Sequence, residues 1–515
     1  MILKNISELR EFIRQYNSTS VLKVGANKCW QNWETWNTKY SNPLNWLQGN
    51  VERNYTIRIM LLASSSNPHR HGDISVDEFN KLINAYHNLN DHTISDKRIL
   101  NDEAEILLCS IKKWESDNNK KVRNLSLKLS DVLNPELIRS HGASLFAQRV
   151  GSFQNSGFGY PFAHIQRTIK FIELLSQYSE GNLSDNFFNY QNLNKLDYFR
   201  LFLTCFSIFG YFYSKEGCGF CNLSKLPNID NNLQKSGITH ENIQIFINQN
   251  SMLFTSKEDH TFRNKVNKTI DNVPTFYQPF LYNYFLEFPL INLDNEKFCL
   301  PDPISFIESC WNQIGEIIFK SGSIRREVLS SVFEDYIESV LLPFIAPHSF
   351  KRISEVTNPN SNKDKRADFL IETSSSYIVL ECKNSIMCAD TSAYYQPDKM
   401  ADIYYRIHFA IEQISVTVDA LKLHDKPVIP LVLTFYDSIA AANVFQEMIR
   451  ATDYCSCLGL NVIPVVYSLH EFEHWISNRS LDNWVELILA KQTGDPPIQP
   501  DNKGHNYGHL SNISF

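Results

Sequence analysis

The pattern of apolar and polar residues predicts two helices and two buried strands in the C-terminal part of the chain. Apolar residues recur at helical spacing over 326–345, where Pro343 is expected to end the helix, and again over 398–422. Residues 427–435 and 461–469 are nearly continuous apolar runs, which are typical of buried parallel strands. Helices and strands in this order predict an α/β layer arrangement.

Between the two helices, the pattern predicts a β-hairpin. Residues 367–372 and 377–383 are β-favouring runs joined by four small polar residues. If the end of the first run pairs with the start of the second, Asp368 lies directly across from Glu381, at about 5 Å on the same face. Strand alternation adds Lys383 to this face. Two carboxylates and an ammonium group are therefore expected to meet on one patch.

Carboxylates this close together need a compensating charge. Opposed like charges are destabilising unless something positive lies between them. A divalent cation would satisfy both carboxylates, and oxygen ligands suit Mg²⁺ or Mn²⁺. The simpler alternative is that Asp368 and Glu381 are solvated charges at the end of an edge strand.

The flanking helices carry polar residues that can reach the hairpin. Glu334 lies beside the apolar stripe of the first helix and can point at the neighbouring sheet edge. On the second helix, Lys399, Arg406 and Gln413 recur every seven residues, so they share one face that differs from the buried isoleucine face.

With these neighbours, residues from about 320 to 490 resemble the PD-(D/E)XK nuclease superfamily, which has the restriction-endonuclease-like fold. That family carries a helical Glu, an Asp that opens one strand, a Glu-x-Lys on the next strand and often a polar residue on the following helix. The matching positions here are Glu334, Asp368, Glu381 and Lys383, with Gln413 or Arg406 on the following helix. The family's Pro before the Asp is replaced by Ala367. The resemblance covers about a third of the chain.

The resemblance implies metal-dependent hydrolysis of phosphodiester bonds. Asp368, Glu381 and the backbone carbonyl of Cys382 would hold Mg²⁺ or Mn²⁺. Lys383 would orient or help to deprotonate the attacking water and stabilise the transition state. Glu334 would hold a second cation or a water bound to the first; the sequence leaves both open.

Three functions remain open from the sequence. The first is a nuclease, with DNA as the favoured substrate, whose N-terminal region recognises a substrate, signal or partner, as in bacterial restriction or antiphage defence. The second is the nuclease subunit of a larger ATPase-driven complex, since the chain lacks a phosphate-binding loop of its own. The third is an inactive nucleic-acid-binding module on the same fold. A partner protein or a homo-oligomer is compatible with each.

The overall charge argues against a general polyanion binder, because the 515 residues carry a net charge of −7. Basic residues nevertheless gather around the proposed site, where they suit phosphate contacts. These candidates are Arg325, Arg326, Lys351, Arg352, Lys363, Lys365 and Arg366. Neighbouring acidic residues dilute the patch, so a solvated loop is the alternative for residues 363–366.

The cysteines and the most apolar segment indicate a cytoplasmic protein without a membrane partner. Eleven cysteines lack a regular framework, and no signal peptide is visible. The C-x-x-C at 218–221 lacks a second pair for zinc, so free thiols are expected. Residues 201–214 are too few to span a bilayer and predict a buried core helix.

Residues 470–474 read HEFEH and match the zinc-protease pattern H-E-x-x-H. Ser468 with Glu471 forms a capping box, and Tyr467 with Phe472 forms a hydrophobic staple. These features explain the segment as the start of a short helix after the last strand.

The whole chain is predicted to be an α+β multidomain protein. Residues 1–318 form a mainly helical recognition or regulatory region of one or two subdomains, in which 56–63 and 287–292 are candidate strands. Residues 319–492 form the α/β restriction-endonuclease-like domain with a central mixed sheet. Residues 493–515 are expected to be an extended tail.

Overall fold

The structure is a computed structural model of the whole chain. The residues that it describes are 5–35, 43–64, 72–95, 97–140, 163–178, 195–217, 219–222, 238–254, 262–273, 278, 281–294, 297–320, 326–346, 349–353, 366–384, 397–435, 445, 448–476, 485 and 488. The described part is a mixed α/β protein with a mostly helical N-terminal half, as predicted.

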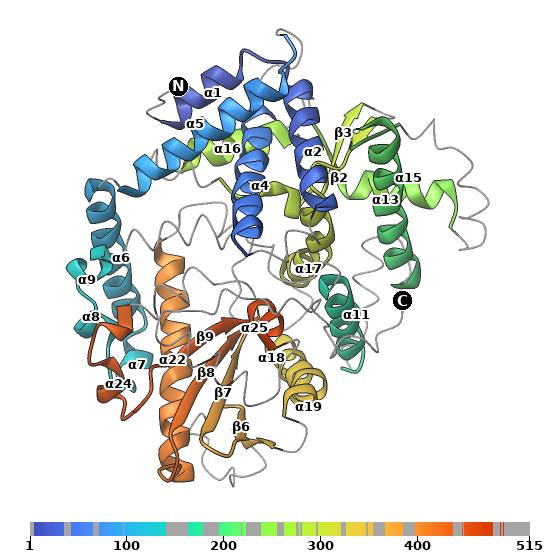
Figure 1. Cartoon of the computed structure of the whole chain (residues 1–515). Helices are drawn as coiled ribbons and strands as arrows, with labels where there is room; N and C mark the ends of the chain where they lie inside the picture. Colours follow the sequence, from blue (N-terminus) through green and yellow to red (C-terminus); the bar gives the residue numbers. More distant parts are fainter. Residues whose placement is uncertain are drawn as a thin grey trace.

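A helical bundle forms the N-terminal end of the molecule, at the top of Figure 1. Apolar faces of its helices pack into one core, with Leu22, Met60 and Phe79 fully buried. The helices of this bundle are α1 (Ile6–Ile13), α2 (Ser18–Glu34), α4 (Pro43–Ser64), α5 (Val76–Ser95) and α16 (Phe262–Asn272), with the 3₁₀ turn η3 (Tyr284–Leu286).

A small four-stranded sheet in the order β1–β4–β3–β2 adjoins this bundle. Its strands are β1 (Phe220–Asn222), β2 (Ser251–Leu253), β3 (Leu290–Asp294) and β4 (Lys297–Cys299). Two helices pack nearby, α13 (Lys195–Glu216) and α15 (His240–Gln249). Phe202 and Phe209 of α13 are buried, so the apolar run at 201–214 is a core helix, as predicted.

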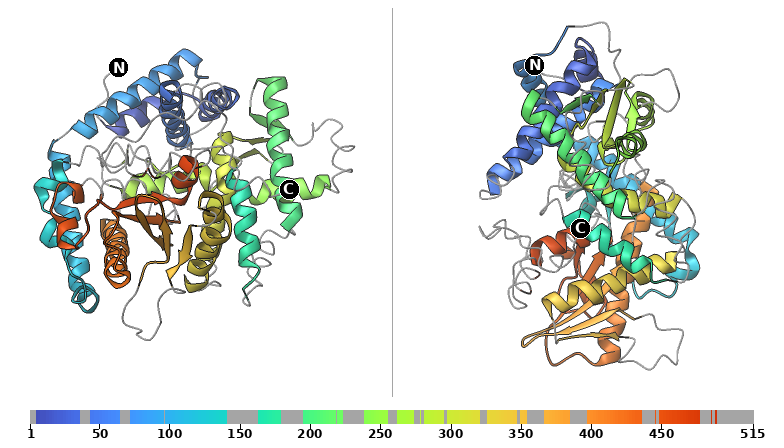
Figure 2. Two further views of the ribbon diagram at one scale, coloured as in Figure 1. Left: turned by 60° about the horizontal axis from the view of Figure 1, so that its bottom comes forward. Right: turned by 90° about the vertical axis from the view of Figure 1, so that its right-hand side faces the viewer.

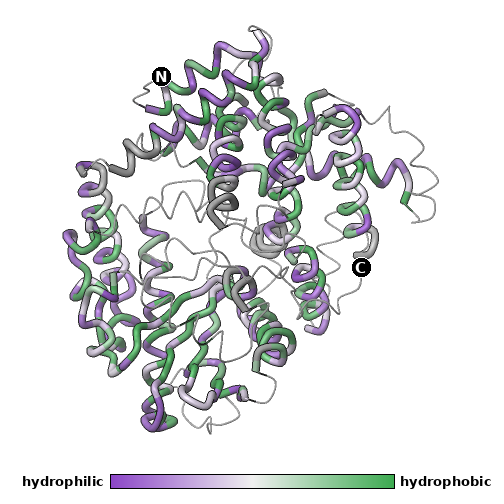
Figure 3. Tube along the Cα trace, viewed as in Figure 1, coloured by the Kyte–Doolittle hydropathy of each residue, from purple (hydrophilic) through white to green (hydrophobic). Residues whose placement is uncertain are grey.

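A five-stranded mixed sheet forms the C-terminal half, in the order β5–β6–β7–β8–β9. Its strands are β5 (Phe350–Arg352), β6 (Phe369–Glu372), β7 (Tyr377–Lys383), β8 (Val428–Thr434) and β9 (Val465–Ser468). The pairs β5–β6 and β6–β7 are antiparallel, and β7–β8 and β8–β9 are parallel. The strands β7, β8 and β9 are hydrophobic along most of their length (Figure 3), which fits a sheet covered on both faces.

Helices cover the two faces of this sheet (Figure 2, left). One face packs against α22 (Pro397–Leu421), which is itself covered by α6 (Lys97–Asp117). The other face packs against α11, α17 and α18, and α25 follows β9 on the same side. The bounds of these last four helices are α11 (Ala163–Leu175), α17 (Pro303–Lys320), α18 (Arg326–Tyr336) and α25 (Leu469–Ile476).

Short helices complete the described elements: α7 (Asn119–Val122), α8 (Leu129–Val132), α9 (Pro135–Ser140), α24 (Tyr454–Cys457) and, directly after α18, the π-helical segment η4 (Ile337–Leu341) and α19 (Leu342–Ile345). Among the described helices, none combines the length and the apolar character that a membrane crossing requires.

Two sequence expectations are wrong. Residues 56–63 lie inside α4 and form no strand. The prediction failed because a short apolar run fits a buried helix as well as a strand. Pro343 does not end the first helix, which continues to Ile345. The π-helical segment η4 ends just before α19, so Pro343 occupies a first-turn position where a missing N–H is tolerated. The other candidate strand, 287–292, overlaps β3.

The main core crosses the predicted domain boundary after residue 318. Phe171 of α11 and Trp311 of α17 pack against Phe435 at the end of β8, with ring centroids 5.0 Å and 4.9 Å from it. The five-stranded sheet therefore shares its core with helices from the N-terminal region. The tail predicted at 493–515 lies outside the described residues.

Candidate active site

The hairpin has the predicted register. Phe369 pairs with Leu380, and Glu372 pairs with Tyr377. Asp368 stands directly before β6, and its backbone N–H donates to the Leu380 carbonyl at 3.1 Å, which continues the ladder. The side chains of Asp368 and Glu381 are therefore neighbours on adjacent antiparallel segments of the hairpin.

Asp368 is anchored to the end of β7 by the backbone. Its Oδ2 accepts a hydrogen bond from the Cys382 N–H at 2.7 Å. Because the N–H and C=O of a strand residue point to the same side, the Cys382 carbonyl also faces Asp368. The Cys382 side chain packs into the core on the opposite face of the sheet, as predicted.

Glu381 is the most buried carboxylate of the group, at 2% exposed. One of its oxygens, Oε1, accepts a hydrogen bond from the Lys383 ammonium. The other, Oε2, is buried and has no hydrogen-bond donor among the described residues. Burial raises the pKa of Glu381, and the adjacent Lys383 charge opposes that rise.

Gln413 of α22 reaches the site. Its Oε1 accepts a hydrogen bond from Lys383 Nζ at 2.6 Å, and its Nε2 donates to the Arg366 carbonyl at 3.2 Å. Arg406 stands two helical turns earlier on α22. Its Nε donates to Asp402 on the same helix at 2.8 Å, so its contact is with its own helix rather than with the hairpin.

Glu334 approaches from α18, on the other face of the sheet. Burial, followed by the negative charge of Asp368, raises the pKa of Glu334 to about 7. Arg352 of β5 holds this side chain, with Nη2 donating to Glu334 Oε2 at 2.7 Å. Glu334 in turn adds to the raised pKa of Glu381, so the three carboxylates form one electrostatic group.

The candidate phosphate-binding residues fall into different environments. Arg352 is already engaged, since it also contacts Glu338 at 2.7 Å and Asp335 at 3.8 Å. Lys351 is exposed on β5, and Arg366 is half-buried beside the hairpin. Arg325, Lys363, Lys365 and the side chain of Arg326 lie outside the described residues.

The site gathers more acidic than basic side chains, and the fold opposes ionisation of the acids. Burial, followed by the charge of Glu381, raises the pKa of Asp368 to about 8. Two cations, Lys383 and Arg352, face three carboxylates, and Arg352 is shared with two further acids. A buried Glu381 oxygen without a donor among the described residues, and carboxyl groups whose charged forms lack compensation, both fit a hard divalent cation.

The carboxylates of the candidate site are not arranged around a common point as ligands of one metal ion. Within the described residues, no group of three or more His, Cys, Asp or Glu side chains is spaced to hold a metal ion. Lys383 and Arg352 occupy oxygens of Glu381 and Glu334, which keeps these two carboxylates turned toward the cations. A metal would have to share these oxygens with the two side chains.

The HEFEH segment is a helix start, as predicted, and it contains a residue whose role the sequence did not reveal. It forms α25, and the rings of Tyr467 and Phe472 lie 5.6 Å apart. Glu473 is fully buried and accepts hydrogen bonds from Arg167 of α11 and from the Tyr336 hydroxyl of α18. Its pairing with buried Arg167 explains how a charged residue between the two histidines can lie in the core.

Comparisons of the chain with protein-family models, with curated proteins and with solved structures each gave no match. The residues and geometry of the hairpin site are therefore the basis on which a function can be proposed.

Proposed function

We propose that the protein is a metal-dependent nuclease of the restriction-endonuclease-like fold, with DNA as the favoured substrate. One observation carries the proposal: Asp368 and Glu381 lie side by side in a buried hairpin, with Lys383 on the same face and one Glu381 oxygen without a donor among the described residues. Carboxylates that can hold a metal ion, together with a cationic side chain, are one combination that can hydrolyse a phosphodiester.

The surrounding elements support the fold assignment. A hairpin at the centre of a mixed sheet, one helix before it on one face and one helix after it on the other face give the arrangement expected from the resemblance. Glu334 and Gln413 come from these two helices and meet the hairpin from opposite sides.

Each side chain has a distinct role in the proposed reaction. Asp368, Glu381 and the Cys382 carbonyl would hold Mg²⁺ or Mn²⁺, and Glu334 would contribute a further carboxylate. The bound cation would supply Lewis acidity and lower the pKa of a water molecule. Lys383 orients the attacking water and stabilises the negative charge that develops on the phosphoryl oxygens.

Gln413 gives Lys383 a second hydrogen-bond partner besides Glu381. When a cation draws charge from Glu381, the ammonium group keeps the Gln413 carbonyl as an anchor. The lysine is thereby held at the site without depending on the ion pair alone.

The biological setting that we propose is bacterial restriction or antiphage defence, by analogy with two-part proteins that join such a nuclease to a recognition region. An ATPase-driven complex with this chain as its nuclease subunit is the alternative, and a partner protein or a homo-oligomer fits either. Loss of activity on the same fold is disfavoured by the intact set of Asp368, Glu381 and Lys383.

The test is incubation of the pure protein with duplex DNA, single-stranded DNA and RNA, each with Mg²⁺, Mn²⁺ or EDTA. We expect cleavage of DNA with either metal and none in EDTA. Asp368→Ala and Glu381→Ala should lose both cleavage and metal binding in calorimetry. Cleavage that persists in EDTA would contradict the metal mechanism, and no cleavage of any substrate with either metal would contradict the proposed function.

A further inference from the structure

The helical turn that carries Glu334 is held at three consecutive residues. Arg352 of β5 binds Glu334. The hydroxyl of Tyr178, three residues beyond the end of α11, donates to Asp335. The hydroxyl of Tyr336 donates to Glu473 of α25. Two of these three contacts therefore depend on elements outside the hairpin and its own sheet.

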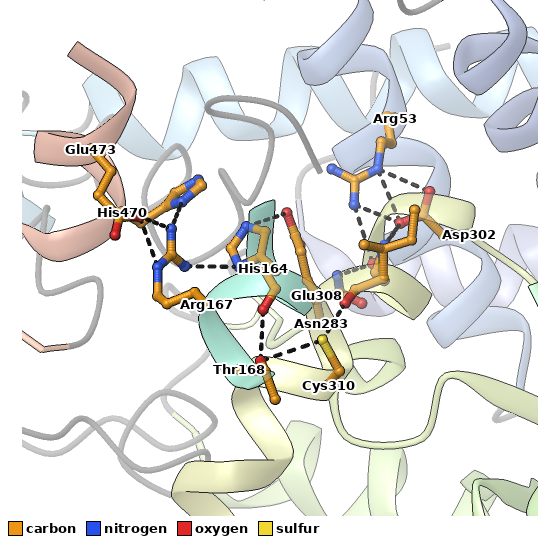
Figure 4. A network of polar contacts seen from close by, with 12 residues as sticks. Arg53, His164, Arg167, Thr168, Asn283, Asp302, Glu308, Cys310, His470 and Glu473 are labelled. Carbon is orange, nitrogen blue, oxygen red and sulfur yellow. Dashed lines mark hydrogen bonds and ion pairs between the residues drawn. The ribbon is translucent and has the colours of Figure 1, made fainter. Parts of the chain in front are cut away.

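Glu473 is fixed by Arg167 of α11 (Figure 4). Both side chains are fully buried, and Arg167 Nε donates to Glu473 Oε2 at 2.8 Å. The same guanidinium lies 3.3 Å from His164 Nδ1 and 3.2 Å from His470 Nδ1. Because arginine only donates, both ring nitrogens act as acceptors and the guanidinium has one preferred orientation.

A buried ion pair such as this one is not in itself a strong source of stability, because both charges lose their hydration. Replacing a buried ion pair with apolar residues is often neutral or stabilising, whereas buried ionic groups have been retained in some proteins for structural specificity. Here Glu473 uses Oε2 for Arg167 and Oε1 for Tyr336. The pair therefore presents one defined acceptor to α18.

The regular hydrogen-bond ladder of α18 ends at Tyr336, so the contact with Glu473 adds to the packing of the apolar face of this helix at the point where the ladder stops. The next five residues, Ile337–Leu341, form the π-helical segment η4. A π-helical turn interrupts the α-helical hydrogen-bond register and is common at functional sites. The elements that follow α18 therefore do not by themselves fix its rotation.

Glu334 and Tyr336 are two residues apart, so they project to opposite sides of the helix. Rotation of α18 about its axis would break the Tyr336–Glu473 contact and would also turn Glu334 away from Asp368. The contact of Tyr178 with the intervening Asp335 resists the same rotation.

We propose that Arg167 and Tyr178, acting through Glu473, Tyr336 and Asp335, are positioning residues that aim Glu334 at the Asp368–Glu381 pair. The N-terminal region thus contributes to the geometry of the site through α11. This inference rests on the proposed nuclease function and names an influence on that site from residues that do not touch it.

Removal of single hydroxyl groups tests this role with little change in packing. Tyr336→Phe and Tyr178→Phe, alone and combined, keep the rings and remove the two contacts to α18. Tyr284→Phe is the matched control, since Tyr284 is a buried tyrosine whose hydroxyl contacts Thr269 in the N-terminal bundle. The measurements are kcat and KM for DNA, the affinity for Mn²⁺ by calorimetry, and Tm.

We expect the combined Tyr336→Phe and Tyr178→Phe variant to lower kcat about tenfold with KM for DNA nearly unchanged, because a misaligned group acts on the chemical step. Tyr284→Phe should lower Tm about as much as Tyr336→Phe alone and leave kcat unchanged. In a Glu334→Gln background, the tyrosine substitutions should have no further effect on kcat, because the residue that they position has already lost its charge.

A second comparison uses the two buried ion pairs drawn in Figure 4. Arg53 of α4 donates to Asp302, directly before α17, at 2.9 Å, and both side chains are as buried as Arg167 and Glu473. Arg167→Lys should lower kcat and Mn²⁺ affinity, whereas Arg53→Lys should affect Tm alone.

The outcomes separate the two proposals. A wild-type protein that neither cleaves DNA nor binds Mn²⁺ would overturn the proposed function and this inference with it. A wild-type protein that cleaves, with tyrosine and arginine variants that match their controls in kcat, would overturn the inference alone. If the tyrosine substitutions lower kcat by the same factor in the Glu334→Gln background as in the wild type, the proposed positioning of Glu334 would likewise be contradicted.

Discussion

Replacing Asp368 with asparagine should stabilise the metal-free protein, although it should abolish metal-dependent activity. Asp368 has a pKa of about 8 in the folded chain, against an ordinary value of 3.8. Between these values the folded state binds more protons than the unfolded state, so the free energy of unfolding falls as pH rises. The neutral amide of an asparagine would remove this charge and keep an oxygen that can accept the Cys382 N–H.

The size of the effect follows from the pKa difference. At pH 7, a shift from 3.8 to about 8 corresponds to at most about 4 kcal/mol, at 1.36 kcal/mol per unit of pKa. The side chain retains some contact with solvent, and its repulsion with Glu381 is shared, so we expect Asp368→Asn to gain about 2 kcal/mol.

The assay is urea and thermal unfolding in EDTA at several pH values, with the exposed Asp131→Asn as the control. The gain in free energy of unfolding of Asp368→Asn over the wild type should be largest near pH 8 and should vanish near pH 4. Addition of Mg²⁺ should raise the Tm of the wild type and have little effect on the variant. A variant that is less stable than the wild type in EDTA at pH 8, or an advantage independent of pH, would refute the reasoning.

Further outcomes are expected from the same geometry. Lys383→Ala should lower kcat at least about 100-fold while metal binding and DNA binding persist, because the lysine acts in the transition state; equal loss of calorimetric metal binding would contradict this role. Glu334→Ala should impair cleavage less than loss of Asp368, and an equal or greater loss would imply a direct two-metal role. Lys351→Glu should weaken DNA binding and reduce its salt dependence, as measured by fluorescence anisotropy at several salt concentrations. Burial lowers the pKa of His408 to about 4, so stability should fall by about 3 kcal/mol as pH drops from about 6.5 to 4; unfolding titrations of His408→Gln should lack this acid loss.

The hairpin could be predicted because its determinants are local. Four polar residues set the turn, alternation sets the faces, and together they fix the pairing of Asp368 with Glu381. The seven-residue spacing places Arg406 and Gln413 on one face of the helix, and the resemblance offers either of them as the polar residue of the site; the structure brings Gln413 to Lys383. Arg406 shares that spacing but pairs with Asp402 four residues earlier, a contact that is also visible in the sequence as an i,i+4 pair of opposite charges.

Strand β5 and the ion pairs of Arg352 were missed for a different reason. A strand of three residues has too little pattern to detect. Without that strand, Arg352 looks like one more surface cation near the site. Its real partners are Glu334, Asp335 and Glu338, which lie on consecutive turns of one helical segment and gather negative charge at the edge of the sheet. Where several acidic residues gather beside a candidate site, a nearby arginine is expected to pair with them rather than to remain available for phosphate.

The contact between Arg167 and Glu473 joins residues 306 positions apart, so no local pattern connects them. The sequence around each of the two residues nevertheless contains a local signal. Arg167 lies on the buried side of α11, among Ile165, Phe171 and Leu174, whereas the other charged residues of this helix, Lys170 and Glu173, lie on its half-exposed side. Glu473 stands among Phe472, Trp475 and Ile476 in α25. A buried charge requires an opposite one, so a charged residue in each of two buried helices predicts that the helices meet. The Tyr336 hydroxyl donates to the same Glu473, so α25 also contacts α18 at a position two residues from Glu334.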